Sequence, residues 1–568
     1  MLQIIRTPRV YDVCVVGSGA AGGMASMVLT QGGLNVVLLE AGPMLNPEHD
    51  FKEHTWPYES SHRGIGIAGE FYKRPYLSEF SAPGVFWEIE GEPYTRAPGS
   101  DFAWLRARIL GGRTNQWARI SLRMSEWDFK PHSSDGSGDD WPITYQDLAP
   151  YYDKVEAYIG VYGSKDNIPS TPDGIFQPPP KPRCYELLIK KACDKLGILC
   201  IPGRRAVITQ PTHGRPPCHY CGQCDRGCIT ASHFNSALVL IPTALATKRL
   251  QIIPHAMARG VLVGDAGEAR AVSYVDKTTG QEKQVRSRVV VVAASACESA
   301  RLLLNSRSEK FPNGLGNSSS VVGRYLTDSL GSGMTGYFPQ LEKLPPHDDE
   351  GAGGMHMFIP WWKWKQKNDF LRGYHIEIGG GRHMPYPGSF HGICHQVEGF
   401  GGNLKRNIRR MYGAFIGLHG RGEMIPNERT YCEIDPNVVD RWGIPVLRFH
   451  YQWSENDIRM AKDMQETFER IILAAGGEPL KSPSPPELPY HLFRPGEILH
   501  ELGTVRMGEN SRTSALNGFC QAHDVKNLFV MDGACFVSQP DKNPTLTILA
   551  LAWRGSEYLL EEARKGNL

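Results

Sequence analysis

A histidine and an asparagine near the C-terminal end of the chain have the side chains that alcohol oxidation requires. His500 stands in the run HELG, and Asn543 begins the run NPT. A neutral imidazole is a base near neutral pH, because its ordinary pKa is about 6.5. Asn543 does not titrate, so it can hydrogen-bond the same substrate oxygen while His500 removes the hydroxyl proton. The two residue types together are suited to removing a proton from an alcohol.

A glycine-rich turn at the other end of the chain predicts a dinucleotide site. The apolar run at 11–16 predicts a parallel strand, GSGAAG follows at 17–22, and a helix is expected from about Ala20 to Gln31. The first glycine permits the turn, the second lets the backbone approach a pyrophosphate, and the third lets helix pack on strand. The helix N-terminus favours phosphate, and an acid after the strand at 36–39 suits ribose hydroxyls. The expected cofactor contacts are Gly17, Gly19, Ala20, Ala21, Gly22, Glu40 and Ala41. This pattern alone does not separate FAD from NAD.

Four cysteines within 11 residues form a C-x2-C-x2-C-x3-C run, Cys218, Cys221, Cys224 and Cys228. This is the spacing of ferredoxin-type ligands, in which soft thiolates bind iron. The neighbouring Arg215 and Arg226 would reduce the negative charge of such a cluster. A structural zinc site and two local disulfides are the alternatives, although zinc ordinarily takes C-x2-C pairs separated by a longer loop. An iron–sulfur cluster near a flavin favours a dehydrogenase with a separate acceptor over an oxidase that uses dioxygen.

Composition limits the partners of the protein. A chain of 568 residues is too long for one compact core, so two interleaved domains are expected. The net charge of +2 without a basic run argues against nucleic acid, and no apolar run approaches the ~20 residues of a membrane helix. The first strand leaves no room for a signal peptide, so we expect a cytoplasmic protein, or a periplasmic one if a signal-bearing partner carries it. The nine cysteines outside the run are scattered singly and indicate reduced thiols.

The elements that would position these motifs alternate with irregular stretches. Helical patterns cover 184–199 and about 454–475, where Ser454 is a favoured N-cap. Strand-like runs occupy 251–294, with a turn at 278–280. A strand is expected at 527–531, followed by a helix for which Asn543 is a favoured N-cap and Pro544 a favoured first residue.

The motifs together resemble those of the glucose–methanol–choline (GMC) oxidoreductases. Residues 15–43, VVGSGAAGGMASMVLTQGGLNVVLLEAGP, are similar to the N-terminal FAD signature of that family, and GGRTNQWARISLR at 111–123 takes the place of its second flavin-contacting motif. The strand-turn-helix at 289–306 is also similar, as are HELGTVRMG at 500–508 and the segment 527–554. The run DWPI at 140–143 is typical of bacterial sugar dehydrogenase flavoproteins, which include gluconate, glucose, fructose and glucoside 3-dehydrogenases.

The resemblance implies an α/β fold in which a Rossmann-like FAD-binding domain is interleaved with an α+β substrate-binding (cap) domain carrying a mostly antiparallel sheet. The FAD-binding segments are expected at 1–50, 100–130, 240–330 and 498–568. The substrate-binding segments are expected at 51–99, 131–239 and 331–497, with the cysteine loop at 215–230.

The resemblance also assigns roles to residues. It implies that His500 is the base and Asn543 its partner, and it implies flavin contacts at Gly111, Gly112, Asn115, Asp532, Gly533, Pro544 and Thr545. Arg113 departs from the small hydroxylated residues that many members have there. Some glucose dehydrogenases of the family hold a three-iron cluster on three cysteines, for which Cys218, Cys224 and Cys228 are candidates here. A 3Fe-4S and a 4Fe-4S cluster both stay open.

We therefore expect an FAD-dependent dehydrogenase that oxidises a hydroxyl of a sugar or glycoside, for example the C3 secondary hydroxyl, by hydride transfer to flavin N5. Its electrons would leave through the iron–sulfur cluster to an acceptor such as a cytochrome c or a quinone-linked subunit, and a small companion subunit is a further expected partner. The alternatives are a sugar oxidase that releases hydrogen peroxide and a non-redox FAD-containing lyase. The aromatic run at 360–365 is expected either to stack on sugar or to pack at a core edge. Other histidines are expected at the surface or in the substrate domain, namely His356, His375, His383, His391, His395 and His523.

Overall fold

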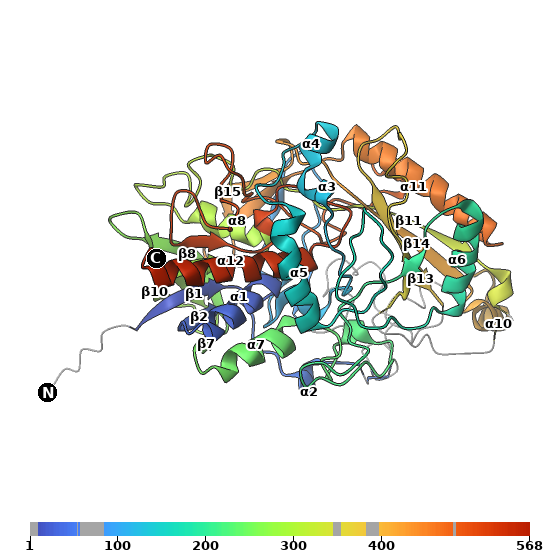
Figure 1. The fold of residues 1–568 in the computed structure, drawn as a ribbon, viewed down its shortest axis with the longest axis horizontal. Coiled ribbons are helices and arrows are strands. Elements are labelled where there is room, and N and C mark those ends of the chain that lie inside the picture. The colour runs from blue at the N-terminus through green and yellow to red at the C-terminus, as the bar shows by residue number, and fades with distance from the viewer. Residues whose placement is uncertain are drawn as a thin grey trace.

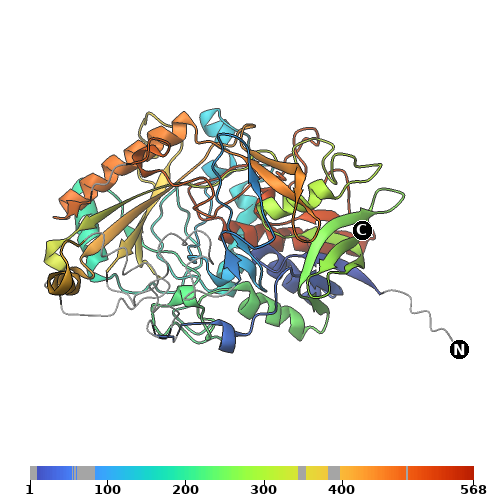
Figure 2. The same ribbon diagram turned by 180° about the vertical axis from the view of Figure 1, so that it is seen from behind.

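A computed structural model describes residues 9–53, 55–56, 59, 84–342, 344, 354–381, 397–480 and 484–568. Two sheets lie side by side, each with helices packed against it (Figure 1). The sheet on the N- and C-terminal side carries the predicted dinucleotide motif, and the other carries the middle of the chain, as the reverse view also shows (Figure 2). The class predicted from the sequence, a Rossmann-like sheet beside a mostly antiparallel one, is confirmed.

The first sheet has the strand order β7-β2-β1-β10-β9-β8, with β18 added beside β10. Strands β7, β2, β1, β10 and β18 run parallel, whereas β8, β9 and β10 form an antiparallel meander. Val13, Val15 and Val16 of β1 and the valines of β10 are buried, as expected of parallel strands covered on both faces. The seven strands are β1 (Val10–Val16), β2 (Val36–Leu39), β7 (Leu250–Ile253), β8 (Ala256–Val263), β9 (Ala269–Asp276), β10 (Glu282–Val292) and β18 (Leu528–Val530).

Helices from both ends of the chain pack beside this sheet. Helix α1 contacts both α7 and α12, and α12 also contacts α5, so segments far apart in sequence share one layer (Figure 1). These helices are α1 (Ala20–Gln31), α5 (Tyr145–Ile159), α7 (Ser236–Ala246), α8 (Ala296–Asn305) and α12 (Thr545–Lys565). The packing explains how the glycine turn and the NPT segment meet although more than 500 residues separate them.

The second sheet is antiparallel, with the strand order β17-β11-β14-β13-β12-β6. Its strands are β6 (Ile201–Pro202), β11 (Leu330–Tyr337), β12 (Met357–Ile359), β13 (Tyr374–Gly380), β14 (Phe415–Gly422) and β17 (Glu478–Pro479). Helices α6 (Cys184–Leu196) and α11 (Glu455–Ala474) pack together against it around a second apolar core. The register of β13 and β14 sets Glu377 opposite His419, and His375 opposite Arg421.

Shorter elements connect the two sheets. The small strands are β3 (Val85–Phe86), β4 (Thr95–Arg96), β5 (Arg106–Ala107), β15 (Tyr431–Val439) and β16 (Pro445–His450). The small helices are α2 (Pro47–Asp50), α3 (Glu126–Phe129), α4 (Pro131–Asp135) and α10 (Gly401–Met411). Single 3-10 turns occur at Gly112–Asn115, Cys224–Arg226, Pro339–Leu341, Pro489–His491 and Gly533–Cys535.

Most of the predicted elements are found, with local differences. Helix α1 has the predicted bounds, and the Ser454 side chain caps α11 as predicted. The strand expected at 289–294 is the end of a longer β10, which the predicted turn at 278–280 joins to β9. The prediction that Asn543 caps α12 is wrong, because Pro544 holds the cap position and the Asn543 side chain turns toward His500 instead. The predicted domain boundaries stay a prediction.

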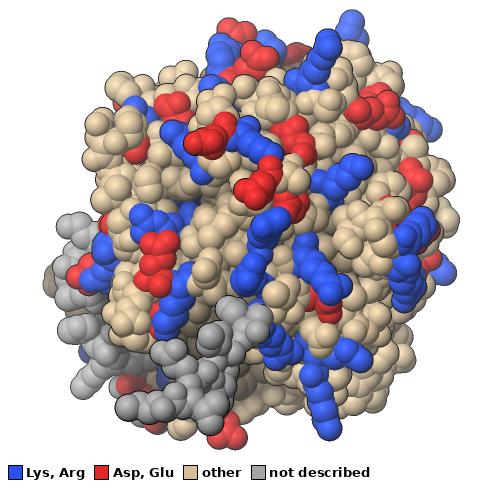
Figure 3. All heavy atoms as spheres, turned by 90° about the vertical axis from the view of Figure 1, so that its left-hand side faces the viewer, with Lys and Arg blue, Asp and Glu red and all other residues tan. Residues whose placement is uncertain are grey.

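The surface carries both signs of charge. On the face that looks out from the left of Figure 1, lysine and arginine side chains are interspersed with aspartate and glutamate (Figure 3). None of the helices within the described ranges combines the length and apolar composition that a membrane crossing requires.

Candidate active site

One cavity of about 720 Å³ connects the two ends of the chain. Its wall includes the glycine turn after β1, Glu40 after β2, and the 3-10 turn that begins at Gly112. The wall continues through His500 and Asn543 to side chains of β13 and β14. A single cavity therefore brings the predicted dinucleotide motif and the predicted acid–base pair together.

The glycine turn has the shape of a pyrophosphate cradle. A Cβ on Gly17 would lie 2.4 Å from the carbonyl oxygen of Ala293, and one on Gly22 would lie 1.8 Å from that of Gly17. A Cβ on Gly19 would meet no atom within 4 Å, so this residue faces open space that a side chain would fill. No side chain caps α1, so its first N–H groups are left for an anion. The turn thus fits the pyrophosphate of FAD.

Glu40 is buried at the end of β2 and lines the same cavity. Its carboxylate accepts hydrogen bonds from the Ser18 hydroxyl and, at 2.8 Å, from the backbone N–H of Gly42. Burial raises the pKa of Glu40, against the lowering effect of these hydrogen bonds. These contacts fix the carboxylate at the cavity wall, where the ribose of a dinucleotide is expected.

The second glycine turn lies against the first. A Cβ on Gly112 would be 3.3 Å from the Cα of Gly19, and the N–H of Gly111 donates to the Ser18 hydroxyl at 2.8 Å. Gly112 lines the cavity, but Gly111, Gly22 and Asn115 are not part of the wall. The Asn115 amide instead donates to the carbonyls of Leu110 and Gly112. The prediction that the Asn115 side chain binds flavin is therefore not supported, because this amide holds the turn.

The structure accounts for Arg113, the residue that departs from the family pattern. Its guanidinium lies 2.5 Å from the buried carboxylate of Glu501, the residue after His500, and also donates to the carbonyl of Leu499. Arg113 thereby ties the second glycine turn to the HELG segment.

The remaining predicted cofactor residues lie on the cavity wall. Ala20, Ala21, Ala41, Asp532, Gly533, Pro544 and Thr545 all belong to it. The Asp532 carboxylate accepts from Ser295 and Ser299, so it also fixes the start of α8. Pro544 and Thr545 begin α12, whose positive end therefore points to the cavity.

His500 and Asn543 meet at this wall. The His500 Nε2 is 3.4 Å from the Asn543 amide nitrogen, and its Nδ1 is 2.9 Å from the Ser329 hydroxyl. The backbone N–H of His500 donates to the buried Asp328 carboxylate at 2.8 Å. The Asn543 amide nitrogen is a donor, so a His500 ring with its proton on Nδ1 accepts a hydrogen bond from Asn543 at Nε2. A substrate hydroxyl would take the place of this amide and donate to the same lone pair. The Asn543 oxygen has no hydrogen-bond partner within the described part of the chain, so it too can accept a bond from substrate.

The carboxylate of Glu377, from the second sheet, lies beside this pair. Glu377 contacts the Asn543 amide at 3.4 Å, pairs with Arg421 at 2.9 Å and lies 3.5 Å from His375. Burial favours protonated Glu377, but Arg421 and His375 outweigh it and hold the pKa well below its usual range. Burial alone would lower the pKa of His375, but Asp541 and Glu377 raise it instead. An anion beside Asn543 thus keeps its amide hydrogens turned away from substrate.

Sequence reasoning did not find Glu377, Arg421, Ser329 or Asp328. None belongs to a recognisable motif, and Glu377 and Arg421 are brought together by the pairing of β13 with β14. The alternating burial of β14 indicates which of its residues share a face, but it does not say that this face meets His500. His375 and His356 were expected to be near the surface or substrate, and both are buried; His383, His391 and His395 lie outside the described residues.

The cysteine run lies next to the cavity. Asp225 lines the cavity, and all four cysteines are free thiols, so the disulfide alternative is not supported. Among the described residues no three of these thiols come within 4.8 Å of one another. Zinc–sulfur bonds of about 2.3 Å would require thiols closer than that, so this arrangement does not suit a single zinc ion.

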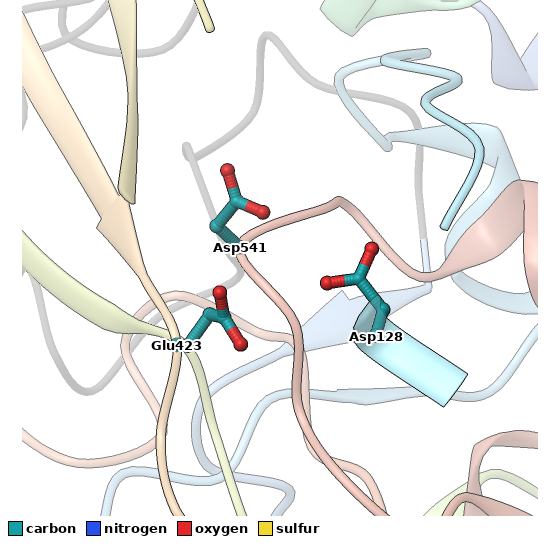
Figure 4. A group of neighbouring side chains, drawn as sticks. All are labelled: Asp128, Glu423 and Asp541. Atoms are coloured by element: carbon teal, nitrogen blue, oxygen red, sulfur yellow. The ribbon is translucent and has the colours of Figure 1, made fainter. Parts of the chain in front are cut away.

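A group of buried carboxylates lies behind the site. Asp128, Glu423 and Asp541 point toward one another from α3, the end of β14 and the NPT segment (Figure 4). The Lys542 ammonium lies 2.5 Å from Asp541 and 3.1 Å from Asp128. Lys542 therefore supplies the positive charge that this group requires.

The aromatic run at 360–365 packs in the second core. Trp361 is buried, with its ring 5.0 Å from that of Tyr374, and Lys363 pairs with Asp463. None of the run lines the cavity, so the structure favours the core-edge alternative over stacking on sugar.

Comparison with known proteins agrees with this arrangement. A family model described as GMC oxidoreductase matches residues 11–330, and a second, C-terminal model with that description matches residues 426–552. The chain belongs to the GMC oxidoreductase family. It is therefore an FAD-dependent oxidoreductase that acts on CH–OH groups.

Relatives of known activity align with nearly the full length of this chain. The 2-methyl-1,2-propanediol dehydrogenase of Mycolicibacterium austroafricanum is 30% identical over 96% of this chain and 95% of its own. The fructose dehydrogenase large subunit of Gluconobacter japonicus is 27% identical over 98% of both chains. The crystal structure of pyridoxine 4-oxidase from Mesorbium loti, at 16% identity, superposes with a TM-score of 0.64 over 96% of this chain and 99% of the other. The last comparison shows the shared fold.

The environment of His500 sets an expected pH dependence. Burial, and then the nearby Arg421, lower the pKa of His500 to about 3, with Glu377 opposing them. The base therefore stays neutral, and we expect kcat/KM to show no acid limb near 6.5 between pH 8 and 5. The same shift lowers the stability of the folded protein in acid, because below pH 6.5 the unfolded chain protonates His500 whereas the native protein keeps it neutral. The free energy of unfolding should fall by about 1.4 kcal/mol per pH unit from this residue. Rate and Tm measured together across this range test both; an acid limb at pH 6.5 with unchanged Tm would contradict the pKa direction.

Proposed function

We propose that the protein is an FAD-dependent dehydrogenase that oxidises a hydroxyl of a sugar or glycoside, with the C3 secondary hydroxyl as one candidate, and passes electrons to an external acceptor. The observation that carries the proposal is the placement of the His500–Asn543 pair on the wall of the cavity that also holds the glycine cradle. A cytochrome c or a quinone-linked subunit is the proposed acceptor, and the description of one relative as a large subunit supports a companion chain.

Each residue of the site has its own role in the proposed reaction. The substrate hydroxyl would take the place of the Asn543 amide at His500 Nε2, which accepts its proton as the carbonyl forms. Asn543 holds the same oxygen, and Ser329 and Asp328 fix the ring and backbone of His500. Bound FAD supplies the acceptor for the hydrogen and electron pair that leave the substrate carbon. The start of α12 places a positive dipole where negative charge develops.

The cysteine run favours a dehydrogenase over an oxidase in this proposal. We infer that Cys218, Cys221, Cys224 and Cys228 hold a 3Fe-4S or 4Fe-4S cluster, which supplies one-electron transfer when bound. Their spacing, their free thiols and the position of Asp225 on the cavity wall support this. An oxidase that reduces dioxygen directly has no need of such a group beside its cavity.

Cys224→Ser tests this assignment. The variant should lose iron and turnover with a one-electron acceptor, whereas sugar should still reduce its FAD, because His500 and Asn543 are untouched. Iron content, electron paramagnetic resonance and anaerobic flavin reduction measure the three quantities. Cys184→Ser removes an exposed cysteine outside the run and serves as the matched control. Zinc in place of iron in the wild type, or fast hydrogen peroxide release by the wild type with sugar in air, would move the function to an oxidase.

A further inference from the structure

Arg205 is a buried guanidinium on the cavity wall that the proposed chemistry does not use. It follows β6, and its backbone exchanges hydrogen bonds with Tyr162 at 3.0 and 3.1 Å. The residue is only 5% exposed and lines the same cavity as His500. Its position is thus fixed by the backbone rather than by its charge.

The guanidinium of Arg205 forms no ion pair with any of the residues that the structure describes. Its Nε and Nη1 have no hydrogen-bond partner in the described part of the chain. Three other cavity arginines have carboxylate partners: Arg113 pairs with Glu501, Arg421 with Glu377, and Arg108 with Glu92 and Glu298. Burial disfavours the charged form of Arg205 and lowers its pKa, and the neighbouring Arg119 adds to this effect while Tyr162 and Glu377 oppose it.

An unpaired buried charge is unfavourable unless something neutralises it. A guanidinium buried without a partner costs several kcal/mol, and buried polar groups that lack partners are rare. Glu377 is the cavity carboxylate whose charge raises the pKa of Arg205, but it already forms ion pairs with Arg421 and His375. Cys224 is a second neighbouring group, but Arg119 acts on its thiol more strongly than Arg205 does. The missing partner is therefore expected to come from a bound molecule.

The phosphates of FAD do not meet this requirement. They are expected at the glycine turn and the start of α1, whereas the electrostatic neighbours of Arg205 are Tyr162, Arg119, Glu377 and Cys224. Glu377 contacts Asn543 at 3.4 Å and is also an electrostatic neighbour of Arg205, and all three residues line the cavity that contains His500. A molecule with its reacting hydroxyl at His500 can place another group near Arg205.

We propose that Arg205 binds an anionic group of the substrate, so that the preferred substrate is a sugar acid whose carboxylate pairs with the guanidinium. A sugar phosphate offers the same oxyanion chemistry and is the second source to distinguish. Arginine donates to carboxylate and phosphate with charge-assisted hydrogen bonds. The inference rests on the proposed function, since it names the substrate class of that site.

Matched substrate pairs test the inference in the FAD-loaded protein. Anaerobic flavin reduction is measured with gluconate against gluconamide, glucuronate against glucuronamide, and glucose 6-phosphate against glucose. In the wild type, kcat/KM should favour at least one charged member by about 10- to 100-fold, the range expected of a charge-assisted hydrogen bond. The pair that shows the preference identifies carboxylate or phosphate.

Arg205→Met should abolish this preference and leave the rate with the neutral member within about threefold, and Arg205→Lys should restore part of it. Arg429→Met removes an exposed positive charge and controls for net charge. Equal wild-type rates within every pair, or loss of FAD from Arg205→Met, would overturn the inference. If no compound of the panel reduces the flavin, the proposed sugar dehydrogenase function fails with it; reduction by neutral sugars alone defeats only the role of Arg205.

Discussion

Replacing His500 with alanine is expected to slow flavin reduction by substrate about 10²- to 10⁴-fold while FAD remains bound. The Nε2 of His500 is the neutral base on the cavity wall that meets Asn543, and its Nδ1 and backbone are engaged by Ser329 and Asp328. Alanine keeps the backbone hydrogen bond to Asp328 and removes only the imidazole. The loss should therefore fall on the rate of reduction and not on the fold.

Stopped-flow reduction under anaerobic conditions measures this rate, and the flavin absorbance of the purified variant reports FAD content. His523→Ala is the matched control, since His523 bonds Ser514 and Gly508 away from the cavity wall. A His500→Ala protein that reduces its flavin as fast as the wild type would remove His500 from the chemistry. Slow reduction combined with lost FAD would assign it to cofactor binding.

Replacing Gly19 with valine is expected to abolish FAD binding, with at least a 100-fold loss of affinity, without unfolding the protein. The backbone of Gly19 is extended, with φ −63° and ψ −157°, so it does not lie in the left-handed region, and a Cβ there meets no protein atom within 4 Å. The side chain would instead occupy the space that the pyrophosphate requires and cover the N–H groups at the start of α1. Gly22→Ala should differ, because its Cβ would collide with the backbone of Gly17 and disrupt the fold.

Fluorescence titration of the apoprotein with FAD measures the affinity, and circular dichroism checks the fold. Gly402→Val, at an exposed glycine in α10, controls for the effect of a branched side chain. Tight FAD binding by Gly19→Val would place the pyrophosphate elsewhere. Unfolding of Gly19→Val alone would show that Gly19 is needed for packing, against the open space seen beside it.

The sequence was most informative where one short segment carries both the geometry and the chemistry. The glycine turn is predictable because the steric limits at Gly17 and Gly22 are set by the strand and helix on either side. His500 and Asn543 were identifiable because each belongs to a motif, although their contact depends on α12 packing against α1. The wrong prediction that Asn543 caps α12 shows what a local pattern does not reveal. Asparagine suits a helix start, but in the fold its side chain contacts His500 instead of the helix N-terminus.

The rest of the site depends on contacts between distant segments. Glu377 and Arg421 meet through the register of β13 and β14, and no local pattern marks either as functional. Arg113 stood out as a departure from the family, but only the fold shows that Glu501 is its partner. The unpaired Nε and Nη1 of Arg205 are likewise invisible in sequence, because they depend on which side chains within the described ranges fail to reach them.

The most direct test of the central claim is an anaerobic absorption spectrum of the purified protein before and after it is mixed with sugars and sugar acids. The account predicts flavin bands above a broad iron–sulfur background, and bleaching of those flavin bands by at least one of these compounds. A protein that binds FAD but keeps it fully oxidised with every sugar, glycoside and sugar acid tested would contradict the proposed function.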